Sequence, residues 1–163
     1  MRSPDILGTN WYKFLEENGK VLARESFVLL EREERLGSNL PDYSFIVFPI
    51  GKTYEGFIKL YLQRMGILNR PDYVDTRFRI GRALNPDVGE RQKDEWWLFD
   101  DLERSCGTPV ARQLWNAWIE CRNHVFHYYI GQATLLNLDE ARKKIDQVCS
   151  AMEVALQCMN QNK

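Results

Sequence analysis

Apolar residues recur at helical spacing along most of this chain, and the spacing predicts a mostly helical fold. The stretches with apolar residues at this spacing cover about residues 10–36, 51–65, 110–129 and 137–160. Gly37 and Gly131 follow two of these stretches, and glycine commonly ends helices. Asn137 and Glu140 resemble a capping box at the start of the last one. We therefore expect an all-α bundle of four to five long helices.

Other parts of the pattern leave alternatives open. Residues 44–48 are apolar and partly β-branched, so they could form a short strand or lead into the helix after Pro49. Prolines and glycines bound two further helices at about 73–84 and 90–104. Gly19 is a candidate break in the first helix. Thr108 is a candidate N-cap before Pro109, with that helix continuing to Tyr129.

Length and composition favour one domain. The chain has 163 residues, 44% of them hydrophobic, which suits a single domain over 1–163 with a bundle core at about 45–160. Its apolar runs are too short for a bilayer and its N-terminus lacks a signal-peptide core, so we expect a cytoplasmic protein. The four cysteines form no C-x-x-C pair. We expect them to be reduced, small hydrophobes, with no metal and no cofactor bound.

Charge is unevenly distributed along the chain. The formal net charge of −1 argues against bulk polyanion binding, and we expect no DNA partner. Residues 50–93, however, carry nine Lys and Arg against five Asp and Glu, a net of +4. Arg77, Arg79 and Arg82 cluster there, with Lys52 and Lys59 upstream. These five cations predict either a phosphate track for RNA or an ordinary solvated surface.

The segment from Arg122 to His127 carries the clearest chemistry, because it reads R-N-x-x-x-H late in a predicted helix. A histidine can move a proton near neutral pH. An arginine can hold a phosphate that gains charge in a transition state, and Asn123 can orient either group. Each residue also has a structural interpretation: His127 as a hydrogen-bonded core or interface residue, Arg122 as a surface charge, and His124 as an ion-pair partner of Glu120.

A helical wheel gives this predicted helix two apolar faces. One is a core face made of Leu114, Trp118, Cys121, Val125, Tyr128 and Tyr129, and the other contains Trp115, Ile119 and Phe126. The wheel places Asn123 and His127 beyond one side of the second face and Arg122 on its other side. A helix with two apolar faces must bury both, so the motif could flank a dimer seam.

These residues resemble the HEPN superfamily of small all-α domains, many of which are metal-independent endoribonucleases with an R-x4-6-H signature. A narrower likeness is to the catalytic domain of RNase LS-type bacterial toxins, which add a glutamate on an earlier helix. In this chain that residue would be Glu55, whose alternative interpretation is an i, i+4 ion pair with Lys59. A second pattern, R-x4-H-x-Y, is met with Tyr129. In toxins with that pattern a nucleotidyltransferase antitoxin adenylylates the tyrosine.

The resemblance implies a homodimeric RNase that cleaves RNA by 2′-hydroxyl attack without metal, as the toxin of a toxin–antitoxin or antiphage defence system. It implies His127 as general acid or base, Arg122 as phosphate ligand, Asn123 and Glu55 as supporting groups, and a cognate antitoxin protein as partner. The alternative is a non-catalytic HEPN-like binding module that docks a nucleotidyltransferase or another protein. A third is a helical scaffold in which the motif arises by chance.

Overall fold

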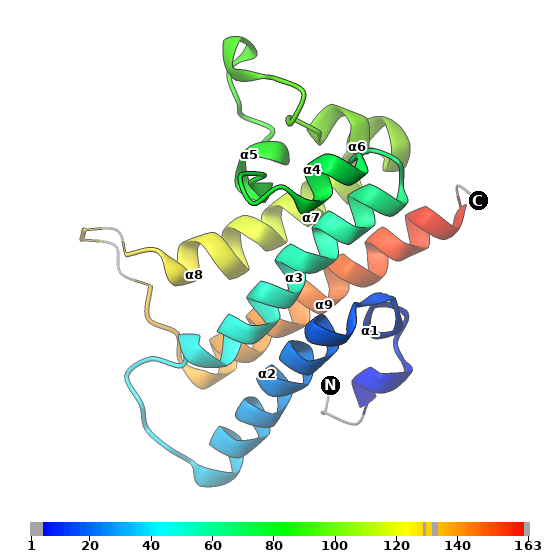
Figure 1. The fold of residues 1–163 in the computed structure, drawn as a ribbon. Helices are drawn as coiled ribbons and strands as arrows, with labels where there is room; N and C mark the ends of the chain where they lie inside the picture. Colours follow the sequence, from blue (N-terminus) through cyan, green and yellow to red (C-terminus); the bar gives the residue numbers. More distant parts are fainter. Residues whose placement is uncertain (1–4, 129, 132–133, 162–163) are drawn as a thin grey trace.

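The computed structural model describes residues 5–128, 130–131 and 134–161, and every regular element in these ranges is helical (Figure 1). This confirms the all-α prediction. The α-helices are α1 (Asn10–Phe14), α2 (Glu17–Leu36), α3 (Ser44–Arg64), α4 (Arg70–Val74), α5 (Ile80–Ala83), α6 (Phe99–Cys106), α7 (Thr108–Trp118), α8 (His124–Phe126) and α9 (Leu138–Gln161). Two 3-10 turns, η1 (Asp5–Gly8) and η2 (Glu90–Gln92), and one π-helical segment, η3 (Ile119–Asn123), complete the order.

Helix α3 is the centre of the bundle. It packs against α2 and α9, and α9 in turn packs against α7 (Figure 1). The rings of Tyr54, Phe57 and Tyr61 stack along α3 with centroid separations of 6.4 and 5.8 Å, and all three are almost fully buried. The Tyr54 hydroxyl donates to the Leu114 carbonyl at 2.9 Å, which ties α3 to α7. The face of α3 next to Tyr54 is thereby held in place against the helix that leads to the Arg122 motif.

The first predicted helix is two helices, and the break is not at Gly19. The backbone becomes extended at Leu15 and Glu16, between α1 and α2. Gly19 lies inside α2, where its carbonyl accepts a hydrogen bond from the Thr53 hydroxyl at 3.2 Å. The break follows from tertiary contacts, because Leu15 is buried and Glu153 of α9 accepts from the Asn10 side chain at 2.7 Å. Gly37 ends α2 as predicted, with a left-handed φ of 57°.

Residues 44–48 are helical, so the possible strand is wrong. They form the first turns of α3, with Ile46 and Val47 buried and Phe45 and Phe48 exposed, a helical alternation. Pro49 is tolerated inside the helix near its start. The next amide, that of Ile50, donates to the Ser26 hydroxyl of α2 at 2.9 Å.

The region between α3 and α7 has shorter helices than predicted. Residues 73–84 were expected to form one helix, but prolines and glycines divide this region into the short helices α4 and α5. Residues 90–104 were likewise expected to form one helix, and they contain only the turn η2 and the helix α6. Two tryptophans anchor the connecting loops: Trp96 Nε1 donates to Asp72 at 3.0 Å and Trp97 Nε1 to the Asn85 carbonyl at 2.8 Å. Gly107, rather than Thr108, occupies the N-cap of α7.

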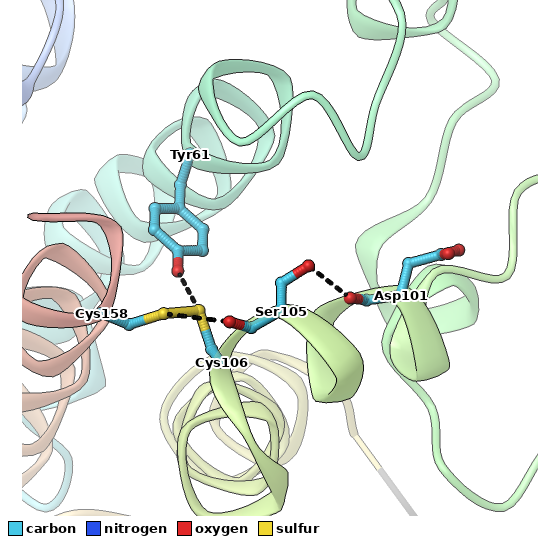
Figure 2. The surroundings of a disulfide bond; sticks show 5 residues. All are labelled: Tyr61, Asp101, Ser105, Cys106 and Cys158. Atoms are coloured by element: carbon cyan, nitrogen blue, oxygen red, sulfur yellow. Dashed lines mark hydrogen bonds between the residues drawn. A yellow bond between two sulfur atoms is a disulfide. The ribbon is translucent and has the colours of Figure 1, made fainter. Parts of the chain in front are cut away.

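Two cysteines that we expected to be reduced form a disulfide. Cys106 at the end of α6 bonds to Cys158 near the end of α9, with a Cα–Cα distance of 5.7 Å (Figure 2). The Tyr61 hydroxyl of α3 donates to Cys106 Sγ at 3.1 Å, so three helices meet there. The partners are 52 residues apart, a pairing that no local spacing reveals. Cys121 and Cys149 are free and buried, as predicted.

Among the described residues, no helix combines the length and the apolar character that crossing a membrane requires.

Candidate active site

Arg122, Glu55 and His127 come together on one side of the bundle. Arg122 Nη2 donates to Glu55 Oε2 at 3.3 Å, and Arg122 Nη1 lies 3.5 Å from His127 Nε2, the outer limit of a hydrogen bond. The side chains of Arg122 and Glu55 are 31% and 32% exposed, and His127 is exposed. The contact joins α3 to the end of the α7–η3–α8 rod. Glu55 is therefore paired with Arg122 rather than with Lys59, the alternative that sequence spacing allowed.

A π-helical segment presents Arg122. The His124 amide donates to the Ile119 carbonyl, a bond that spans five residues rather than four. Such a segment shifts the direction of the side chains after it, and it is often found at functional sites. Asn123, the last residue of this segment, is half-buried, and its carbonyl accepts the His127 amide at 3.2 Å.

The helix ends at Phe126, three residues earlier than predicted. His127 has an extended backbone, with φ −104° and ψ 133°, so its ring turns back toward Arg122. The wheel prediction that Arg122 and His127 flank opposite sides of an apolar group is therefore wrong. Tyr128, which the wheel placed on the core face, is 79% exposed. Tyr129, the predicted modification target, lies outside the described residues.

Gly51 lets α3 approach the motif helix. A Cβ at this buried position would lie 2.9 Å from Phe126 Cε2 and 3.8 Å from Arg122 Cγ. Phe126 in turn packs edge-to-face on Phe48 of α3, with ring centroids 5.3 Å apart. The missing side chain thus sets the distance at which Glu55 of α3 meets Arg122.

The Trp118 ring packs against the Arg122 guanidinium. The helical wheel had assigned Trp118 only to the core face. The Arg122 guanidinium carbon lies 5.6 Å from the Trp118 ring centroid, in cation–π range, and Trp115 stacks on Trp118 at 5.6 Å. Gly81 of α5 packs against the edge of the Trp118 ring, because a Cβ at this position would lie 2.3 Å from Trp118 Cη2. The i, i+4 spacing of Trp118 and Arg122 was the sequence signal for this contact.

The donors of the Arg122 guanidinium determine which ring nitrogen of a hydrogen-bonded His127 can carry the proton. A guanidinium has donors and no acceptor, so a hydrogen bond from Arg122 requires His127 Nε2 to carry a lone pair. The neutral ring then carries its proton on Nδ1. The cluster thus combines a cation that can hold an anion, a nitrogen that can accept a proton, and a carboxylate that balances the cation. His124 is separate: its Nδ1 lies 3.6 Å from Glu120, the ion-pair interpretation of that residue.

The predicted arginine track is largely engaged within its own segment. Arg77 pairs with Asp75 at 2.8 Å, and these hydrogen bonds lower the pKa of Asp75 to about 2. Arg82 pairs with Asp94 at 2.6 Å. Arg79 donates to the backbone carbonyls of Thr76 and Phe78. Gly81, the residue before Arg82, links this segment to the site, because a Cβ there would lie 2.3 Å from the Trp118 ring.

Lys52 and Lys59 lie on α3 on either side of Glu55, and they line a groove of about 460 Å³. We call it the α2–α3 groove: its walls are the α1–α2 junction, residues 52–60 of α3, and Tyr73 and Val74 of α4. Neither lysine contacts the Arg122 cluster. The Lys52 ammonium lies 5.7 Å from the Phe48 ring centroid and the Lys59 ammonium 5.9 Å from that of Phe78.

An exposed apolar rim borders the cluster. Its members are Phe48, which packs on Phe126, and Tyr128, which directly follows His127. Phe45, Ile130 and Leu135 are further large apolar residues that are exposed in the neighbouring parts of the sequence.

Over the described residues, no group of three or more His, Cys, Asp and Glu side chains has an arrangement that could hold a metal ion. Comparisons with protein-family models, with curated proteins and with solved structures gave no match to this chain.

Proposed function

We propose that this protein is a metal-independent endoribonuclease of the HEPN type, acting in the cytoplasm as the toxin of a toxin–antitoxin or antiphage defence system. One observation carries the proposal: Arg122 contacts Glu55 at 3.3 Å and His127 at 3.5 Å, although Glu55 is 67 residues away in the sequence. Arg122 thus contacts both Glu55 and His127, two residues that the resemblance implied. A partly exposed arginine beside a histidine suits phosphoryl chemistry.

In this mechanism Arg122 Nη1 turns from His127 Nε2 to the bound phosphate, which frees the lone pair on that nitrogen. The 2′-hydroxyl of the RNA then attacks the adjacent phosphorus and gives its proton to His127 Nε2. Arg122 stabilises the negative charge that builds on the phosphoryl oxygens. The bond from phosphorus to the 5′-oxygen breaks, and that oxygen takes up a proton from a second histidine or from water. The products are a 2′,3′-cyclic phosphate and a 5′-hydroxyl. Glu55 orients Arg122, and Asn123 positions the motif segment.

A homodimer supplies the second Arg122–His127 pair in this proposal. The apolar rim supports it, since Phe48 is 51% and Tyr128 79% exposed. Surface of this kind is characteristic of a protein interface. A cognate antitoxin would then act by covering the cleft, separating the protomers or modifying the site. A cytoplasmic location implies that the Cys106–Cys158 bond opens under reducing conditions.

One observation favours a non-catalytic binding module instead. Glu55 already occupies one donor group of Arg122, so an incoming phosphate would have to compete with a carboxylate. In that case the cluster would stabilise the junction of α3 with the motif segment, and the apolar rim would dock a nucleotidyltransferase or another protein.

The test is incubation of the purified protein with mixed-sequence RNA in EDTA, followed by analysis of the ends. We expect 2′,3′-cyclic ends from the wild type, a rate lower by about 10²–10³-fold in Arg122→Ala, and a comparable loss in His127→Ala. His124→Ala is the matched control, because His124 pairs with Glu120 outside the cluster and should leave the rate unchanged. Absence of cleavage by intact wild type, or equal cleavage by all variants, would reject the ribonuclease.

A further inference from the structure

The α2–α3 groove has the size and lining of a ligand site. Its volume of about 460 Å³ falls in the range typical of small-molecule sites, roughly 300–1,000 Å³. Leu15, Leu22 and Leu60 make much of its wall apolar. An apolar wall of this kind accepts a flat, uncharged ring such as a nucleobase.

The rim of this groove is mainly cationic. Lys52 and Lys59 stand seven residues apart on α3, which separates them by about 10 Å along the helix axis. Their stems line the groove while their ammonium groups can remain in solvent. Arg70 adds a third cation, with its guanidinium carbon 5.1 Å from the Tyr73 ring centroid. The acidic residue in the lining, Glu16, accepts a hydrogen bond from the Tyr73 hydroxyl at 2.9 Å.

Lys52 and Lys59 of the groove lie on α3 close in sequence to Glu55 of the candidate active site, although no residue of the Arg122 cluster lines the groove itself. Glu55, which holds Arg122, lies three residues after Lys52 and four before Lys59, so all three side chains share one face of the helix. A polymer whose phosphate sits at Arg122 would therefore pass the two lysines on leaving the site. Its next base would face the apolar wall of the groove.

We propose that the α2–α3 groove receives an unstacked nucleotide of single-stranded RNA next to the phosphate held at Arg122. The base packs on the apolar wall, and Lys52 and Lys59 bind the flanking phosphates. A duplex is excluded, because its bases are paired and stacked and cannot enter. This inference rests on the proposed ribonuclease function for the placement of the phosphate.

Gly56 offers a test that leaves every charge in place. It lines the groove, and a Cβ there would meet nothing within 4 Å. Leucine at this position should fill the groove, whereas alanine should not. Both replacements favour the helix, so neither should impair folding. The measurement is fluorescence anisotropy of a short, labelled single-stranded RNA, made on His127→Ala protein so that the RNA stays intact, with thermal melting as the folding check.

We expect Gly56→Leu to weaken binding by roughly tenfold, the loss of one base contact, and Gly56→Ala to change it by less than about twofold. Replacing Lys52 and Lys59 by Gln should lower the slope of log K against log salt by roughly 1.4, about 0.7 per phosphate. Lys143→Gln on α9 is the control lysine, since it lies outside the groove lining.

RNA binding in the α2–α3 groove and ribonuclease activity can be rejected independently of each other. Equal RNA binding by the Gly56→Leu and Gly56→Ala variants would reject the groove as an RNA site, and so would binding of a duplex as tight as that of the single strand. Cleavage of RNA in EDTA would in that case still support the ribonuclease activity. No RNA binding by His127→Ala protein also overturns the groove. Weakened binding in Gly56→Leu without any wild-type cleavage supports the groove as an RNA site and rejects the enzyme.

Discussion

Glu55 of α3 lies 3.3 Å from Arg122 of the π-helical segment, and this pair joins the two parts of the candidate site. Each side chain is about one-third exposed, so solvent weakens the attraction and its share of fold stability is small. Its main effect is geometric, because it fixes the guanidinium beside His127.

Replacing Glu55 by Gln should therefore affect activity more than stability. We expect the RNA cleavage rate to fall by roughly 10- to 100-fold as Arg122 loses its orientation, while the free energy of unfolding drops by less than about 1 kcal/mol. Cleavage kinetics and urea denaturation measure the two effects. Glu153→Gln, which alters a carboxylate that contacts α1 far from the site, is the control for a general charge effect. A Glu55→Gln enzyme of wild-type rate would remove Glu55 from the site.

Gly81→Ala should disturb the site through Trp118. The added Cβ would lie 2.3 Å from the indole, which is 8% exposed and cannot move away freely. Overpacking of this kind typically costs about 1–3 kcal/mol. We expect that loss in denaturation experiments, together with altered tryptophan fluorescence. The matched control is Gly56→Ala, where the new Cβ enters open space; equal stability of the two variants would contradict the close contact.

The Cys106–Cys158 disulfide should stabilise the fold substantially. It closes a loop over a sequence separation of 52 residues, for which the chain-entropy model gives about 4 kcal/mol. The double variant Cys106→Ser/Cys158→Ser should lose a comparable free energy of unfolding, and reductant should then have no further effect. If the wild type has the same stability with and without reductant, the bond is absent in solution.

The two free cysteines should resist thiol reagents while the protein is folded. Burial raises the pKa of both Cys121 and Cys149 to about 12, so almost no thiolate exists at pH 8. Colorimetric titration should detect no thiol in the native protein, two in urea, and four after reduction. A native protein that reacts rapidly would contradict the burial.

The same two thiols should make stability depend on alkaline pH. Because the pKa of each thiol in the folded protein is raised above its ordinary value of 9.0, their contribution to stability is fully present below pH 9. It declines as the pH rises toward 12, where the unfolded chain binds fewer protons than the folded one. Cys121→Ala should flatten this decline in urea denaturation between pH 8 and 11, measured beside the wild type.

Local features of the sequence predicted much of the fold. Apolar periodicity located the four long helical segments, because burial of one face requires that spacing. The Asn137–Glu140 box is formed, with the Asn137 amide donating to Glu140 at 2.8 Å and the Glu140 amide to Asn137 at 2.9 Å. Residues 44–48 were ambiguous because a short apolar run suits a strand and a buried helix equally.

The sequence by itself determined the long helical segments, the caps at Gly37 and at Asn137–Glu140, and the chemical types at the site, since these depend on neighbours within about one helical turn. Only the tertiary structure decided which partners meet. Glu55 has one possible ion-pair partner nearby in the sequence, Lys59, and one far away, Arg122. The close approach of α3 to the motif segment at Gly51 brings Glu55 to Arg122. The turn of His127 toward Arg122 and the Cys106–Cys158 bond likewise depend on packing between segments, which no local pattern encodes.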